Sequence, residues 1–311
     1  MTLAFYSHAD CRAHFMGRGH PECPERLDAI SDHLIATGLI DSLDMREAPL
    51  ASASQLERAH AAAHVREMQA AIEPLRVSGE HCQIDPDTSA GPGTWTAALR
   101  AAGAAVAATD AVIDEEAETA FCAVRPPGHH ATRDAAMGFC FFNNVCVAAR
   151  HALDVRGLAR VAIVDFDVHH GNGTEDIIAG DDRVLMASFF QHPLYPYSGA
   201  VPKGTNMVNV PVPPYARGAQ VREAIEAMWL PRLEAFQPQM IFISAGFDAH
   251  REDELGQLGL VEGDYEWITR QLVALAQRHA GGRIVSCLEG GYNLSALARS
   301  VAAHLRVLAG L

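Results

Sequence analysis

Polar side chains with the chemistry of metal ligands and proton carriers gather in four short segments of the chain. The segments are GHH at 128–130, DFDVHH at 165–170, GFD at 246–248 and EGGY at 289–292. Each follows a short apolar run that predicts a buried strand. In an open parallel α/β sheet, ligands bind beyond the carboxyl ends of the strands. We therefore expect the four segments to converge on one crevice.

The second segment has the spacing of a metal-binding strand end. Asp165, Asp167 and His169 alternate, and side chains two residues apart on a strand point to the same side. Asp167 and His169 can therefore hold one cation, with Asp248 as the natural third ligand. Three protein ligands leave room for water and substrate, and this oxygen-rich set suits zinc, ferrous iron or cobalt. The competing interpretation is a strand-end turn with capping side chains, which the neighbouring Gly-Asn-Gly at 171–173 disfavours.

A histidine pair and a tyrosine supply groups that carry protons and stabilise a charged oxygen. His129 and His130 follow a Pro-Pro-Gly run, and one of them can act as a general base. The alternative is a histidine pair on the surface without a catalytic role. Tyr292 lies on a glycine turn, where its hydroxyl can donate a hydrogen bond to an oxyanion. A turn tyrosine packed against a helix would give the same sequence pattern.

The composition excludes several classes of protein. With 311 residues, 49% of them apolar and 20% charged, the chain can bury a full core, and we expect one domain over residues 1–311. The net charge of −14 disfavours nucleic acid and would suit a cationic partner, although ordinary acidic solubility also explains it. Apolar runs fall short of the ~20 residues that a membrane helix needs, and residues 1–10 lack a signal-peptide pattern. We expect a cytoplasmic protein that binds no membrane.

Other catalytic signatures are absent from the sequence. It has no G-x-S-x-G elbow, no H-E-x-x-H helix, no G-x-G-x-x-G and no P-loop. The seven cysteines include no C-x-x-C pair, so neither a disulfide framework nor a thiolate zinc site is indicated.

Alternating helical and apolar patterns show which elements must position the polar segments. Helices are predicted at 24–38, 94–113, 140–155, 217–235 and 262–279, and strands at 119–124, 159–167, 184–189, 240–245 and 283–288. Strands that alternate with long helices predict a parallel sheet covered on both faces.

Taken together, these motifs resemble those of the metal-dependent histone deacetylase superfamily, which includes the acetylpolyamine amidohydrolases. The resemblance is carried in order by segments 20–26, 125–130, 138–140, 165–173, 244–249 and 289–292. Their Gly-Asn-Gly and Ser-Ala-Gly-Phe-Asp-Ala forms are similar to the class II side of the family. The resemblance implies the α/β arginase/deacetylase fold, a single domain with a parallel sheet of about eight strands flanked by helices.

The resemblance also implies a role for each polar group. It makes Asp167, His169 and Asp248 the ligands of a zinc ion, with ferrous iron or cobalt as alternatives. It makes His130 the general base and then the acid, with His129 as its electrostatic partner.

Three further roles follow from the same resemblance. Tyr292 would polarise the acyl carbonyl, and Asp165 would orient His129. Asn172 stands where class I members have a carboxylate that faces the second histidine. Because a neutral amide stabilises a histidine cation less than a carboxylate does, we expect a lower pKa for His130.

The substrate site and a structural potassium site are implied in the same way. Phe139 would form one wall of an acyl-lysine tunnel, and Gly138 would offer its carbonyl to the substrate amide. The second wall is expected within residues 191–195, and Arg26 matches an arginine near the acetate exit route. Potassium would bind backbone oxygens of the residues Asp165, Asp167, His169, Ser188 and Phe189.

The expected reaction is hydrolysis of an N-acylated amine by metal-activated water. The expected partner is an acylated lysine peptide or a small acylated amine, in a chain that could form oligomers. The alternative within the enzyme class is an acetylpolyamine amidohydrolase. Such enzymes carry a carboxylate near the tunnel mouth, seven residues beyond the third metal ligand, where this chain has Leu255, with Glu254 just before it. The alternative from another class is a non-catalytic acyl-lysine binding module, which an intact metal triad and Tyr292 disfavour.

Overall fold

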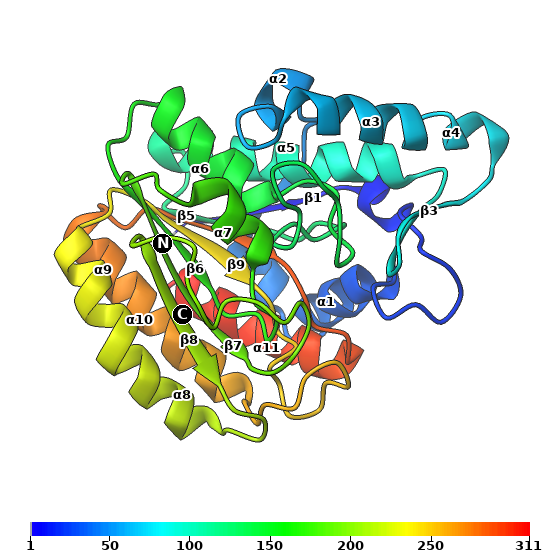
Figure 1. Cartoon of the computed structure of the whole chain (residues 1–311). Coiled ribbons are helices and arrows are strands. Elements are labelled where there is room, and N and C mark those ends of the chain that lie inside the picture. Colours follow the sequence, from blue (N-terminus) through cyan, green and yellow to red (C-terminus); the bar gives the residue numbers. More distant parts are fainter. Residues whose placement is uncertain (1) are drawn as a thin grey trace.

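An eight-stranded parallel sheet forms the centre of the molecule (Figure 1). The computed structural model describes residues 2–311. The strands are β1 (Leu3–Ser7), β2 (Leu43–Glu47), β5 (Thr119–Cys122), β6 (Val161–Asp165), β7 (Val184–Gln191), β8 (Met207–Val212), β9 (Ile241–Ala245) and β10 (Ile284–Leu288). Their order across the sheet is β2-β1-β5-β10-β9-β6-β7-β8.

Helices cover both faces of this sheet (Figure 1). On one face lie α5 (Thr94–Ile113), α6 (Asn144–Asp154) and α7 (Asn172–Ile178). On the other lie α1 (Glu25–Ala36), α8 (Gly218–Ala224), α9 (Leu230–Phe236), α10 (Glu262–His279) and α11 (Leu294–Leu308). The central strands are apolar along their whole length because both of their faces are buried under helices.

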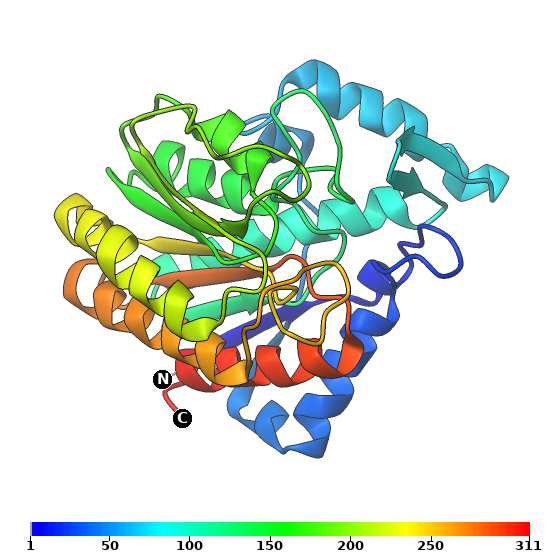
Figure 2. The same cartoon turned by 60° about the horizontal axis from the view of Figure 1, so that its bottom comes forward.

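A smaller peripheral group lies beyond α5. It consists of α2 (Ala53–Leu56), α3 (Ala62–Ile72), α4 (Leu75–Ser78) and a hairpin of β3 (Cys82–Asp85) and β4 (Thr88–Ala90). Figure 2 shows these cyan elements projecting from the layered body. Two 3₁₀ turns, η1 (Ala9–Arg12) and η2 (Leu39–Ser42), lie in the first part of the chain.

The alanine-rich sequence of helix α5 is explained by its close packing on the sheet. It packs on β1, β5 and β10, and small side chains allow a close approach to the sheet. Gly103 lets the loop after β2 approach α5, because an added Cβ there would lie 2.0 Å from the Pro49 carbonyl oxygen. By length and composition alone α5 could cross a membrane, but 67% of its most apolar window is buried inside the fold.

The predicted elements are present, and most of their bounds agree to within two residues. Two predicted helices differ from the structure in a larger way. The helix predicted at 140–155 begins only at Asn144, because the Asn143 side chain caps it by accepting a hydrogen bond from the Cys146 amide. The helix predicted at 217–235 contains a π-helical turn, η3 (Ile225–Trp229), between α8 and α9. Strands β1, β2 and β8 were not among the predicted ones.

Candidate active site

The four polar segments follow four neighbouring strands. Strands β5, β10, β9 and β6 are adjacent in the sheet, and each is parallel to its neighbour. The histidine pair comes after β5, Tyr292 after β10, Asp248 after β9 and Asp167 after β6. The expected convergence at one edge of the sheet is therefore present.

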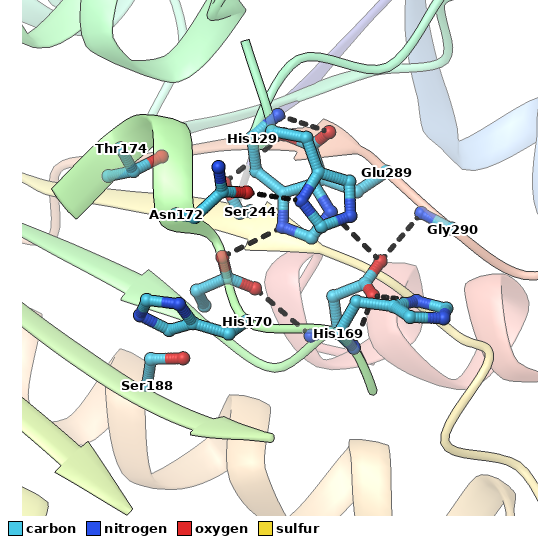
Figure 3. A network of polar contacts seen from close by, with 12 residues as sticks. His129, His169, His170, Asn172, Thr174, Ser188, Ser244, Glu289 and Gly290 are labelled. Carbon is cyan, nitrogen blue, oxygen red and sulfur yellow. Dashed lines mark hydrogen bonds and ion pairs between the residues drawn. The ribbon is translucent and has the colours of Figure 1, made fainter. Parts of the chain in front are cut away.

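Asp167, His169 and Asp248 form the most compact group of potential metal ligands. One donor atom from each lies within 4.8 Å of the others, close enough for one cation to bind all three. The Nδ1 atom of His169 is 3.1 Å from Asp167 Oδ1 (Figure 3). The same atom is 3.1 Å from Asp248 Oδ2. Burial and the nearby Asp167 carboxylate raise the pKa of Asp248 to about 7. Two buried carboxylates crowded in this way have the charge that a divalent cation would balance.

Glycine residues make the room that this crowding requires. A Cβ atom on Gly246 would lie 2.0 Å from Asp167 Oδ2, and one on Gly290 would lie 2.1 Å from Asp248 Oδ2. The Gly290 amide instead donates to Asp167 Oδ2 at 2.8 Å. The carboxylates are therefore held against bare backbone, which fits a cation that needs closely spaced oxygen ligands.

The two histidines have different partners. His129 Nδ1 is 3.0 Å from Asp165 Oδ2, and His130 Nδ1 is 2.7 Å from Asn172 Oδ1 (Figure 3). The Asn172 amide nitrogen is directed to Met137 Sδ at 3.3 Å, so its oxygen faces the ring. His130 therefore donates from Nδ1, which leaves Nε2 unprotonated when the ring is neutral.

These partners shift the two histidine pKa values in opposite directions. Burial alone would lower the pKa of His129, but the Asp167 and Asp165 carboxylates outweigh it and raise the pKa well above its usual value. Burial lowers the pKa of His130 well below its usual value, and the charges of His129 and His169 lower it further. One ring is thus stabilised as a cation and the other as a neutral base.

Glu289 is a member of the site that sequence reasoning left without a role. Its Oε2 atom accepts hydrogen bonds from the amides of Gly128 at 2.6 Å and His129 at 3.1 Å, while Oε1 accepts from Ser244 Oγ at 3.1 Å. The carboxylate therefore ties the histidine loop to β9 and β10. The signal in the sequence was a carboxylate placed directly between a buried strand and two glycines.

Tyr292 is held through its backbone. Asp253 Oδ2 accepts hydrogen bonds from the amides of Tyr292 at 2.6 Å and Asn293 at 3.0 Å. The Arg26 guanidinium lies 5.0 Å from the centre of the Tyr292 ring, at cation–π distance. Burial raises the pKa of the Tyr292 phenol well above its usual value, so the hydroxyl stays protonated and able to donate.

Arg26 belongs to a buried ionic cluster behind the site. It donates to the Gly291 carbonyl at 2.7 Å and to Glu22 Oε1 at 3.2 Å. Arg125 binds the same carboxylate, with Nη2 at 2.6 Å from Glu22 Oε2. Burial would raise the pKa of Glu22, but Arg125 and its other neighbours keep it well below its usual value.

A cavity of about 240 Å³ leads to these groups. His130, His169 and Tyr292 line it together with Gly138 and Phe139, as expected. Gly138 has φ +56°, and a Cβ atom there would lie 2.5 Å from His130 Cδ2. Phe139 packs edge-on against Tyr292, with ring centres 6.0 Å apart.

The structure also identifies the wall for which the sequence offered only residues 191–195. Leu194 and Tyr195 line the cavity, and the Tyr195 ring centre is 5.2 Å from that of His130. Leu255 and Asp87 complete the lining. Asp87 comes from the turn between β3 and β4, and no pattern in the sequence indicated it.

The residues expected around potassium lie at the end of β6, in the segment that follows it, and within β7. Asp165 pairs with Ser188 in the register of these strands, and Phe189 follows within β7. Phe141 and Phe142 are buried in the core.

Comparison with known proteins assigns this architecture to a family. The histone deacetylase domain model matches residues 20–308. A histone deacetylase-like amidohydrolase of Pseudomonas aeruginosa is 40% identical, covering 88% of this chain and 73% of its own length. A probable deacetylase of Archaeoglobus fulgidus is 36% identical, covering 94% of this chain and 82% of its own length.

A solved structure supports the same assignment. The HDA15 HD domain superposes with a TM-score of 0.91 at 33% identity, covering 99% of this chain and 90% of that one. The predicted arginase/deacetylase fold and the predicted resemblance are confirmed. The protein belongs to the histone deacetylase family.

Proposed function

We propose that the protein is a metal-dependent deacetylase that hydrolyses the side-chain amide of an acylated lysine. The observation that carries this proposal is the meeting of a cation site, a neutral histidine and a protonated tyrosine on one cavity. These are the parts that amide hydrolysis needs: an electrophilic centre, a base and an oxyanion donor.

Asp167, His169 and Asp248 would hold the divalent ion, for which we infer zinc. When bound, such an ion lowers the pKa of water and polarises a carbonyl oxygen. The three side chains already lie at mutual distances that one cation can bridge. Their two carboxylates would balance its charge, so the site would need no further charged ligand.

His130 would carry the proton. Its Nε2 atom is the free acceptor because Nδ1 is occupied by Asn172. It would take a proton from the attacking water and return it to the amine nitrogen as the amide C–N bond breaks. His129, kept charged by Asp165, would stabilise the negative charge that develops beside it.

Tyr292 would donate its hydroxyl hydrogen to the oxygen that gains charge when the carbonyl is attacked. Phe139, Leu194 and Leu255 give the cavity apolar walls. Such walls suit the methylene chain of a lysine better than a substrate chain that carries charged groups. We further propose that potassium, held by backbone oxygens at the end of β6, just after it and within β7, stabilises this part of the sheet. We also propose that the protein acts in the cytoplasm.

An acetylpolyamine is the second candidate substrate. Leu255 lines the cavity, whereas the neighbouring Glu254 is exposed and does not line it. A leucine cannot pair with the ammonium groups of a polyamine, so this observation favours the acyl-lysine amide. The intact cation site and Tyr292 likewise favour an enzyme over a silent binding module.

Kinetics on matched substrates test the proposal. The zinc-loaded protein is assayed with an acetyl-lysine peptide, acetylspermidine and acetylputrescine under identical conditions. We expect a higher kcat/KM for the peptide. A tenfold or greater preference for an acetylpolyamine would make the second candidate the correct one, and binding of the peptide without hydrolysis would support the silent module.

A further inference from the structure

A second cleft, of about 540 Å³, opens beside the cavity of the candidate active site. Both are lined by the loop that follows β9, seen in yellow to orange in Figure 2. Leu255 lines the first cavity, and its neighbour Gly256 lines the second. Two guanidinium groups, those of Arg217 and Arg251, form part of the walls of the second cleft. One loop therefore forms part of the wall of both the first cavity and a cleft with two arginines.

Backbone hydrogen bonds fix the loops that carry these arginines. The Gly259 amide donates to the Ala216 carbonyl at 2.9 Å, beside Arg217, and the Arg251 amide donates to the Leu260 carbonyl at 2.9 Å. Arg217 also pairs with Gly259 as a parallel bridge. The two guanidinium groups are thus attached to ordered backbone, which lowers the entropy lost when they bind a ligand.

Tyr215 adds an unusual feature to the same cleft. Its side chain is 74% exposed, and its φ of +67° lies in the left-handed region that a tyrosine rarely adopts. The Tyr215 amide is held by the Gln257 carbonyl at 2.9 Å across the cleft. Residues held in sparsely populated backbone regions cluster at active sites and ligand-binding segments.

Within the described residues 2–311, neither arginine forms an ion pair. In residues 2–311, no carboxylate lies within 4.0 Å of the side-chain nitrogens of Arg217 or Arg251. Glu252, next to Arg251 in sequence, is bound by Arg299 at 2.9 Å. Asp253 is turned inward to the Tyr292 amide. In a chain with a net charge of −14, this cleft keeps two positive charges available.

We propose that the cleft binds an acidic side chain of a peptide substrate whose acylated lysine occupies the neighbouring cavity. This inference rests on the proposed function. Guanidinium groups bind carboxylates through paired, charge-assisted hydrogen bonds. The cleft would therefore select acylated lysines that have an aspartate or glutamate nearby, and it would repel basic segments and polyamines.

Peptides that carry either a carboxylate or an amide of the same shape test the cleft directly. A fluorescent acetyl-lysine peptide is made with either Asp or Asn at each of the three positions on both sides of the lysine. Both kcat/KM and the Kd from fluorescence anisotropy are measured for the 311-residue chain. At one or more positions we expect about a tenfold preference for Asp over Asn, the scale of a partly exposed charged hydrogen bond.

Two double variants separate the cleft from the overall charge. R217Q/R251Q should reduce the Asp preference to less than about twofold in both kcat/KM and Kd. R66Q/R76Q removes the same charge from exposed arginines of another surface hollow, on α3 and α4, and should leave the preference unchanged.

The outcomes separate a failure of the cleft inference from a failure of the proposed function. Equal rates and affinities for Asp and Asn peptides, or a preference that persists in R217Q/R251Q, would overturn the inference while leaving the deacetylase intact. If no peptide is hydrolysed but the Asp peptide binds in an arginine-dependent way, the proposed function fails and the cleft remains an acidic-peptide site.

Discussion

The inner part of the site and its mouth are built in different ways. The inner groups, such as Asp167, Asp248 and His129, are fully buried and each makes several hydrogen bonds to strand ends. At the mouth, Tyr195 and Leu255 are half-buried and lie on loops. The chemistry is thus attached to the rigid sheet, whereas substrate choice is left to segments that can change without disturbing the core.

The largest effect is expected at the inner part, from Asp248→Ala. Loss of one of three ligands should abolish stoichiometric metal binding and lower kcat by roughly 10³-fold or more, because both water activation and carbonyl polarisation depend on the ion. Elemental analysis and activity are measured on the same sample. Circular dichroism should show a folded domain, since the apolar sheet does not depend on this carboxylate. Full metal occupancy in the variant would show that the ligands are wrongly assigned.

The histidine pair should show a graded response. His130→Ala is expected to lower kcat/KM by about 10²- to 10⁴-fold, the range for removal of a general acid–base, and His129→Ala by less. The acidic limb of the pH–rate profile should disappear in His130→Ala. Because the pKa of His130 is lowered, that limb should lie below pH 6.5 in the wild type. A greater loss in His129→Ala would mean that the two roles are exchanged.

Glu22 tests whether the buried charges behind the site hold the fold together. Glu22→Gln leaves Arg26 and Arg125 buried without their carboxylate, which should destabilise the protein by about 3–5 kcal/mol in urea unfolding at pH 7. Glu116→Gln, which removes an exposed partner of Arg46, is the control and should change stability by less than about 1 kcal/mol.

The same carboxylate predicts a dependence on pH. The pKa of Glu22 is lowered in the folded protein, so its stabilisation is complete above the unfolded value of about 4.3 and is lost as the pH falls towards the folded value. The wild type should therefore lose stability in acid more steeply than Glu22→Gln. Parallel acid curves for the two proteins would contradict the ionised state of Glu22.

Tyr292→Phe should keep the metal and the fold but lower kcat by about 10²-fold, the usual effect of removing one oxyanion donor. Thermal unfolding should be nearly unchanged because the Tyr292 backbone, not its hydroxyl, is held by Asp253. An unaltered kcat would show that other groups stabilise the oxyanion.

The mouth should give the smallest effect. Leu255→Glu places a carboxylate on the cavity wall. The kcat/KM for acetylspermidine, divided by that for an acetyl-lysine peptide, should rise about tenfold. Glu254→Gln, outside the cavity, should leave that ratio within about twofold of the wild type. The reverse result would place Glu254, rather than position 255, at the substrate.

The difference between the two regions also explains what the sequence could predict. Helix α5 and strands β9 and β10 have strong apolar patterns because they are buried on all sides. Strand β2 escaped prediction because it is an edge strand with mixed exposure, and β8 because it is another edge strand that contains Pro211. Their pattern does not separate them from loops.

The site residues that could be predicted lie at strand ends, and those that could not lie on loops. Asp167, His169 and Asp248 could be assigned because strand parity and parallel topology bring them together. Leu194, Tyr195 and Asp87 could not, because their places depend on the path of loops between distant elements. Only the folded chain shows that the β3–β4 turn reaches the same cavity as the loop after β7.

Metal dependence of hydrolysis tests the central claim most directly. Acetate release from an acetyl-lysine peptide is measured with the wild-type protein as purified, after chelation, and after addition of one equivalent of zinc. Chelation should abolish release, and one equivalent of zinc should restore it while the protein stays folded throughout. Undiminished release by the metal-free protein, or no release by the zinc-loaded protein, would contradict the account.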